Sequence, residues 1–154
     1  MLQVLLTLHV LAAMWFGGGM MAFVLLHMRL LKTNSLVERV YYLRIALQFT
    51  KIAIVPGGLS AVIFGIALAL QQGYDILHTL WLLLSLLLFI YATLMGIAYF
   101  TPNDRRILRI CQEEQAKNQS GEMSHSLLHR PHILALRLIN VLAVLTLILL
   151  MIVK

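Results

Sequence analysis

Six histidines are the residues of this sequence best suited to hold a metal or a cofactor, and some of them recur at helical spacing. His9 and His27 are 18 residues apart, or five α-helical turns, so one helix would carry both on the same side, about 27 Å from each other. Two further histidines, His78 and His132, begin apolar segments later in the chain. Paired imidazoles from facing helices hold b-type haem in helical bundles, which makes haem ligation the first chemistry to consider.

The composition identifies the elements that must position these side chains. The chain has 154 residues, of which 61% are hydrophobic and only 12% charged, whereas an ordinary soluble domain carries about 25% charged residues. Four segments have the roughly 20 apolar residues that a membrane-spanning helix needs. The sequence therefore predicts an all-α, four-transmembrane-helix bundle in a single membrane domain, residues 1–154, with spans at about 2–31, 51–70, 77–100 and 132–153.

Lysine and arginine predict the orientation of the bundle. Eleven of the twelve basic residues border the first and third connections, and only Lys154 lies at the other side. The positive-inside rule then places both termini outside (N-out/C-out) and both basic loops in the cytoplasm, as in a bacterial inner membrane protein with periplasmic termini. The net charge of +6 thus indicates contact with the anionic lipids of the cytoplasmic leaflet and not with nucleic acid.

The basic connections contain two further helix signals. Ser35, followed three residues later by Glu38, forms a capping box that begins a helical extension of the second span. After Pro102, an amphipathic pattern predicts a short cytoplasmic interfacial helix between the third and fourth spans, in the stretch DRRILRICQEEQ. The stretch AKNQSGEMS that follows is typical of a flexible linker.

The predicted topology brings the histidines together in two pairs. It places His9 level with His78 near the outer face, and His27 level with His132 near the inner face. His27, His78 and His132 lie near helix ends, where an imidazole can simply hydrogen-bond to interfacial water. His9 lies several residues inside its span, where an ionisable group is costly and more often functional.

Other side chains could support or replace these ligands. Arg44, Lys51 and Arg137 offer cations for haem propionates, although the first two can also snorkel to the cytoplasmic surface. His125 and His129 have the i, i+4 spacing of a metal pair, yet solvated loop histidines are the commoner interpretation there. The glycines favour close helix packing, including contact with a second copy of the chain in a homo-oligomer.

Three stretches of the chain resemble known membrane families. They read LHVLAAMWFGGG, FTKIAIVPGGLSAVIFGIALALQQGY and TLWLLLSLLLFIYATLMG. Together they resemble a bacterial family of predicted four-helix membrane proteins of unknown function and, more distantly, HemJ-type protoporphyrinogen oxidases and the membrane domain of CopD copper-resistance proteins. The resemblance implies that His9 matches the first-helix histidine that HemJ proteins need for haem and activity, and that His78 lies in their third-helix motif. Leu80 departs from HemJ proteins, which carry lysine there, so haem binding is favoured over porphyrinogen oxidation.

These observations leave three functional hypotheses. The leading one is a haem b protein that transfers electrons, with His9 and His78 as metal ligands, His27 and His132 as a second pair, and a quinone or respiratory complex as partner. A second hypothesis is a non-catalytic accessory or assembly subunit whose histidines only hydrogen-bond. A third is copper handling, in which methionines near His9 would assist, or HemJ-like oxidation.

Overall fold

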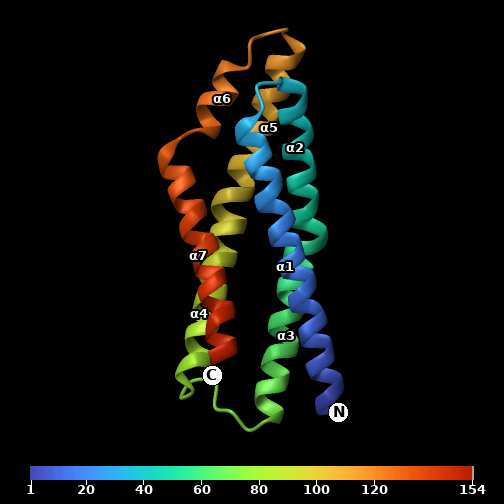
Figure 1. Cartoon of the computed structure of the whole chain (residues 1–154), viewed down its shortest axis with the longest axis vertical. Helices are drawn as coiled ribbons and strands as arrows, with labels where there is room; N and C mark the ends of the chain where they lie inside the picture. Colours follow the sequence, from blue (N-terminus) through green and yellow to red (C-terminus); the bar gives the residue numbers. More distant parts are fainter. Residues whose placement is uncertain (154) are drawn as a thin grey trace. The chain divides into compact units, whose positions relative to one another are not determined.

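The computed structural model describes residues 1–153 and is built from helices (Figure 1). Within those residues, four helices are long and apolar enough to cross a membrane: Leu2–Lys32, Leu36–Gln71, Leu80–Ala116 and Pro131–Met151. The all-α, four-span prediction is therefore confirmed. The side of the membrane that each terminus faces stays a prediction, and Lys154 lies outside the described residues.

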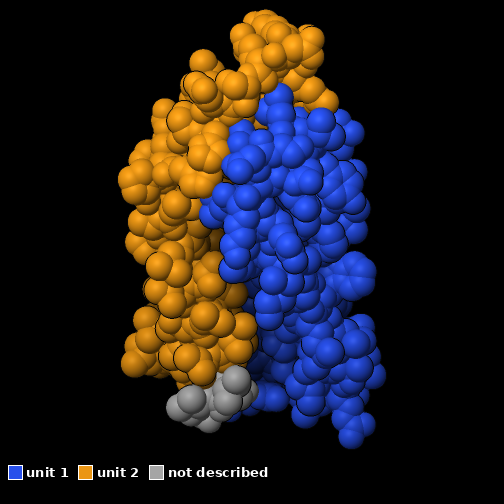
Figure 2. Space-filling model, turned by 45° about the horizontal axis from the view of Figure 1, so that its top comes forward, with its two compact units in different colours: residues 1–75 blue, residues 76–154 orange. Residues whose placement is uncertain are grey.

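Two of the four spanning helices are composite, and a short helix precedes the last one. The elements in chain order are α1 (Leu2–Lys32), α2 (Leu36–Phe49), η1 (Thr50–Ile54), α3 (Val55–Gln71), α4 (Leu80–Leu94), η2 (Met95–Phe100), α5 (Thr101–Ala116), α6 (Glu122–Leu128) and α7 (Pro131–Val153), where η denotes π-helix. The chain divides into two compact units, Met1–Asp75 and Ile76–Lys154 (Figure 2). That the chain forms a single membrane domain stays a prediction.

In the first unit, a tight turn at residues 33–35 reverses the chain between α1 and α2. The Ser35 hydroxyl accepts a hydrogen bond from the backbone N–H of Glu38 at 3.4 Å, which confirms the predicted N-cap. The Glu38 carboxylate does not return to the backbone of Ser35, as a full capping box requires, but accepts a hydrogen bond from the Thr33 hydroxyl. The buried Arg39 donates through Nε to the Thr33 carbonyl at 3.3 Å, so both sides of the turn are tied together.

Small residues let α1 pack closely against η1 and α3. A Cβ built at Gly19 would lie 2.7 Å from Ala53 Cβ, and one built at Gly57 would lie 2.9 Å from the backbone N of Phe16. Neither space can hold a methyl group, because real Cβ atoms do not approach so closely. The expectation that glycines favour close helix packing is also met at Gly65, which contacts His9, and Gly58 is buried. These contacts fix the antiparallel register of the two helices.

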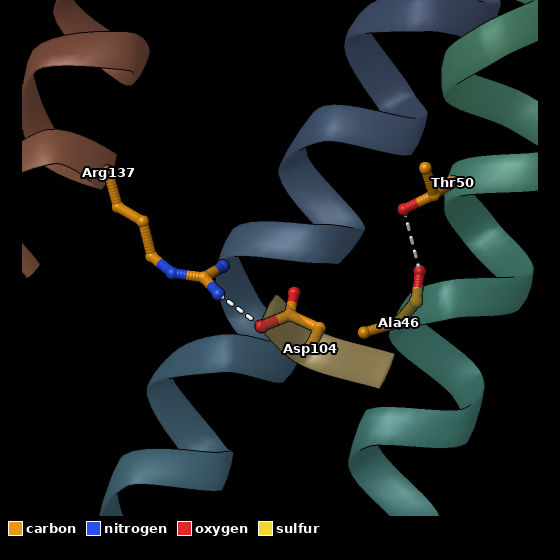
Figure 3. Close-up of polar contacts among 4 residues, drawn as sticks. All are labelled: Ala46, Thr50, Asp104 and Arg137. Carbon is orange, nitrogen blue, oxygen red and sulfur yellow. Dashed lines mark hydrogen bonds and ion pairs between the residues drawn. The ribbon is translucent and has the colours of Figure 1, made fainter. Parts of the chain in front are cut away.

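The composite helix α2–η1–α3 contains a π-helical segment directly before its proline. Pro56 has no N–H, so the Ile52 carbonyl four residues earlier loses its α-helical partner. The indole Nε1 of Trp15 donates to this carbonyl at 3.3 Å. In the same region, the Thr50 hydroxyl donates to the Ala46 carbonyl one turn back at 3.0 Å (Figure 3). Side chains therefore satisfy or share the backbone carbonyls around the break.

In the second unit, α4, η2 and α5 form one continuous helix, and α7 packs against α4. The predicted interfacial helix forms as α5, but it continues the third span where the sequence suggested a separate element. The physical reason is the π-helical segment η2, which precedes Pro102 as η1 precedes Pro56. Its i, i+5 pattern, seen in the hydrogen bond from Thr101 N–H to the Gly96 carbonyl, accommodates the proline without ending the helix.

The predicted linker is shorter than expected, because α6 begins at Glu122. Gly121 precedes it with φ +77°, a left-handed conformation that suits glycine. The buried Glu114 carboxylate of α5 accepts hydrogen bonds from the N–H groups of Met123 at 3.0 Å and Ser124 at 3.3 Å. This carboxylate therefore caps the first turn of α6 and holds it beside the end of α5.

Candidate functional site

His9 is the predicted site residue whose surroundings are most specific. Its ring lies against Gly65 of α3, where an added Cβ would approach His9 Cε1 to 3.0 Å and Nδ1 to 3.2 Å. Its Nδ1 is 2.8 Å from the carbonyl oxygen of Ala61, one turn before Gly65. Glycine at position 65 thus allows a partly buried imidazole to reach the backbone of the neighbouring helix.

This contact indicates which nitrogen of His9 carries the proton. A carbonyl oxygen can only accept, so Nδ1–H is the donor, and in a neutral imidazole Nε2 then carries the lone pair. Metal-ligating histidines are commonly held in this way, with one ring nitrogen donating to a backbone carbonyl and the other facing the metal. The same contact would also serve a histidine that only joins two helices.

The three consecutive glycines of α1, residues 17–19, differ in their contacts. Gly19 is in close contact with η1, whereas a Cβ added at Gly17 or Gly18 would meet no heavy atom within 4 Å among the described residues. The predicted close approach of a neighbouring helix is therefore confirmed for Gly19. Trp15, one turn before this run, is half exposed and anchored by its indole N–H to Ile52.

The remaining predicted histidine ligands lie at several places in the two units. His27 of α1 stacks in parallel on Phe23, one turn earlier, with ring centroids 6.3 Å apart. His78 lies between α3 and α4, and His132 is the second residue of α7; both are exposed. The pairs His9–His78 and His27–His132 each join residues of different units, so both pairings stay predictions.

The predicted cations of the first unit are far from His9. Arg44 on α2 and Lys51 in η1 are both exposed. Lys51 precedes Gly65, the contact of His9, by 14 residues, which corresponds to about 21 Å along the helix. A cofactor held by His9 would therefore not reach Lys51 or Arg44, and these cations can serve only a group bound nearer to His27.

Arg137, the third predicted cation, already has an anionic partner. Its Nη2 donates to the Asp104 carboxylate in an ion pair that links α7 to α5 (Figure 3). Both side chains are buried, and the guanidinium carbon also lies 5.1 Å from the centroid of the Phe100 ring. The charge of Arg137 is thus balanced by Asp104 within the second unit, and its role toward a haem propionate stays a prediction.

The histidine cluster before α7 forms a stacked pair. The rings of His125 and His129 lie 4.1 Å apart with an interplanar angle of 23°, and His129 Nδ1 is 3.0 Å from the His125 carbonyl. These two side chains lie on and directly after α6, where the sequence predicted a solvated loop. Within residues 1–153, no group of three or more His, Cys, Asp or Glu side chains is arranged to hold a metal ion.

A family comparison places the chain among known sequences. The model of a family described as predicted integral membrane protein, DUF2269, matches residues 3–154. The chain belongs to this family. No curated protein matches it significantly, and no solved structure does. This DUF2269 protein is thus a multi-pass membrane protein, while its resemblance to HemJ and CopD proteins stays a prediction.

Asp104 is the residue of this DUF2269 protein that sequence reasoning missed. It follows Pro102, and an acidic residue just after a proline is typical of the first turn of a new helix, so the sequence predicts that Asp104 lies on an interfacial helix. The available signal was the pattern of α5, in which Asp104 shares one stripe with the buried Ile107 and Cys111. An acidic residue on the apolar stripe indicates a buried partner.

Proposed function

We propose that this protein binds haem b in the membrane and transfers electrons, and that Nε2 of His9 would be one ligand of the haem iron. The supporting observation is the contact of 2.8 Å between His9 Nδ1 and the Ala61 carbonyl. It favours the tautomer in which Nε2 has the lone pair, and it restrains the orientation of the ring. A ligand oriented in advance loses less conformational entropy when it binds.

The donor set of the first unit would supply one nitrogen ligand for a haem iron. His9 supplies the nitrogen, the Ala61 carbonyl holds the opposite ring nitrogen, and Gly65 admits the ring. When bound, a haem would supply one-electron transfer. His78 is the proposed second ligand, and His27 with His132 a proposed second pair. The register makes Lys51 and Arg44 suitable cations only for a group near His27.

The proposal extends to location and partners. The asymmetry of basic residues supports a bacterial inner membrane with both termini outside, and lipid with an anionic cytoplasmic leaflet. An electron carrier of this kind would exchange electrons with a quinone or with a respiratory complex. The exposed faces of the helices leave room for a homo-oligomer.

A second candidate function, an accessory or assembly subunit without a cofactor, rests on the same geometry. The contact of His9 with α3, together with the close approaches at Gly19 and Gly57, forms a helix interface that is complete without a ligand. In this alternative, His9 contributes a hydrogen bond between helices and nothing more.

Absorption spectroscopy of the detergent-purified protein separates the two functions. The protein is expressed with haem precursor in the medium, and a parallel sample is incubated with hemin. We expect a Soret band that shifts on reduction with dithionite and is lost in His9→Ala. Gly65→Ala should weaken or shift the band, because the added methyl group displaces the imidazole without removing it.

Gly17→Ala is the matched control, since an added Cβ there meets no atom within 4 Å of the described chain. Gly17→Ala should leave the folded yield unchanged. Gly65→Ala should still elute as one species, so that a change in its band reports on the imidazole and not on unfolding. A colourless wild-type protein that also fails to take up hemin would support the accessory function. A band that persists unchanged in His9→Ala would exclude His9 as a ligand.

A further inference from the structure

Four polar side chains of the second unit lie on α5 and α7 around one contact between these helices. Asp104 and Arg137 form the ion pair that joins the two helices (Figure 3). Asn103 is the neighbour of Asp104, and Asn140 follows Arg137 by one turn of α7. Asp104 is 2% exposed, and Arg137 and Asn140 are each 9% exposed, so these three residues belong to the interior, whereas Asn103 is partly exposed.

The two asparagines carry buried polar atoms whose hydrogen-bonding capacity is unused by the protein. Nδ2 of Asn103 and Oδ1 of Asn140 are inaccessible to solvent, and neither has a hydrogen-bond partner among the described residues. A buried amide left in this state costs free energy, and native proteins contain few such groups unless a bound molecule satisfies them. The unused donor of Asn103 and the unused acceptor of Asn140 therefore each indicate a bound molecule.

The chemistry of the cluster restricts that ligand. Because the carboxylate and the guanidinium balance each other, a charged ligand would leave an uncompensated charge in the interior. The ligand must both accept and donate hydrogen bonds, and this holds even if either amide is rotated so that its oxygen and nitrogen exchange places. It must also be small, because Asn140 is almost completely buried.

We propose that the cluster binds internal water beside the Asp104–Arg137 pair. Water is the smallest neutral molecule that donates and accepts, and buried waters usually bond to about three otherwise unsatisfied polar groups. Water would lower the free-energy cost of burying this ion pair between two spanning helices, because it can donate hydrogen bonds to the remaining lone pairs of the carboxylate. This site is independent of haem and of His9.

Water-edited solid-state NMR tests the proposal on the full chain in lipid bilayers. Selective ¹⁵N-asparagine labelling gives signals for Asn34, Asn103, Asn118 and Asn140, the asparagines of the chain. Asn34 and Asn118 are exposed and serve as wet references. We expect the side-chain amides of Asn103 and Asn140 to receive magnetisation from water at mixing times similar to those references. Dry amides at both positions would overturn the proposal.

The melting temperature of Asn140→Leu provides a second test, because a hydrated amide and a dry amide predict changes of opposite sign. Leucine has a similar size and no polar atom, so it removes a penalty if the amide is dry and removes a water anchor if the amide is hydrated. We expect a lower melting temperature than that of the wild type, and no change in the exposed control Asn34→Leu. A higher melting temperature for Asn140→Leu would contradict the proposal. If this variant does not fold, the NMR result on the wild type decides.

Discussion

Substitution of Gly57 by alanine should disrupt the contact between α1 and α3, whereas the same substitution at Gly18 should not. A Cβ at Gly57 would lie 2.8 Å from Trp15 Cδ1, 2.9 Å from the backbone N of Phe16 and 3.1 Å from its Cα. Two of these atoms belong to the backbone, so no side-chain rotation can relieve the clash. A Cβ at Gly18 would meet no heavy atom within 4 Å of the described chain.

The structure gives the size of the difference between the two variants. Alanine is favoured over glycine in a helix by about 0.5–1 kcal/mol, and this gain is common to both positions. Gly18→Ala should therefore be slightly more stable than the wild type. At Gly57 the overpacking cost of about 1–3 kcal/mol is added. The free energies of unfolding should thus differ between the variants by about 1–3 kcal/mol, or roughly 5- to 150-fold in the unfolding constant.

Unfolding in mixed micelles of dodecylmaltoside and SDS measures this difference. Tryptophan fluorescence is recorded in a Trp81→Phe background, so that Trp15 alone reports on the first unit. Gly57→Ala should unfold at a lower SDS fraction than the background protein, and Gly18→Ala at an equal or higher one. Equal stability of the two variants would refute the register of α1 against α3, and with it the placement of His9 beside Gly65.

Three further predictions concern polar contacts in both units. Asp104→Leu or Arg137→Leu alone should lower the free energy of unfolding by about 3–5 kcal/mol. The double variant should lose much less stability, because it leaves no buried charge, and a double-mutant cycle measures this coupling. Ser35→Ala should lower the free energy of unfolding by about 0.5–1 kcal/mol through loss of the N-cap of α2, measured by the same SDS titration. Glu114→Gln should speed hydrogen exchange at the Ser124 amide by about tenfold, because a charged acceptor is replaced by a neutral one; unchanged exchange would mean that the carboxylate does not cap α6.

Local features of the fold were predictable because each depends on a short stretch of sequence. The spans follow from runs of apolar residues, and the start of α2 follows from Ser35 and its neighbours. The joining of α5 to the third span was not predictable, because Pro102 normally marks a helix boundary, and only the π-helical segment before it lets the helix continue. The candidate site was predictable at His9, since an imidazole inside a span is conspicuous in any apolar sequence.

The sequence by itself thus determined that this protein lies in a membrane, which four segments span it and which residues inside them are costly to bury. Tertiary structure alone decided which partners those residues have. Asp104 meets Arg137 across 33 residues and His9 meets Ala61 across 52. The physical reason is that α1, α3 and α7 are apolar on nearly every side, so sequence periodicity does not fix their rotation about their own axes. In the first unit that rotation is set by the close approaches at Gly19, Gly57 and Gly65, where only the absence of a side chain leaves room for Ala53, the Phe16 backbone and the His9 ring.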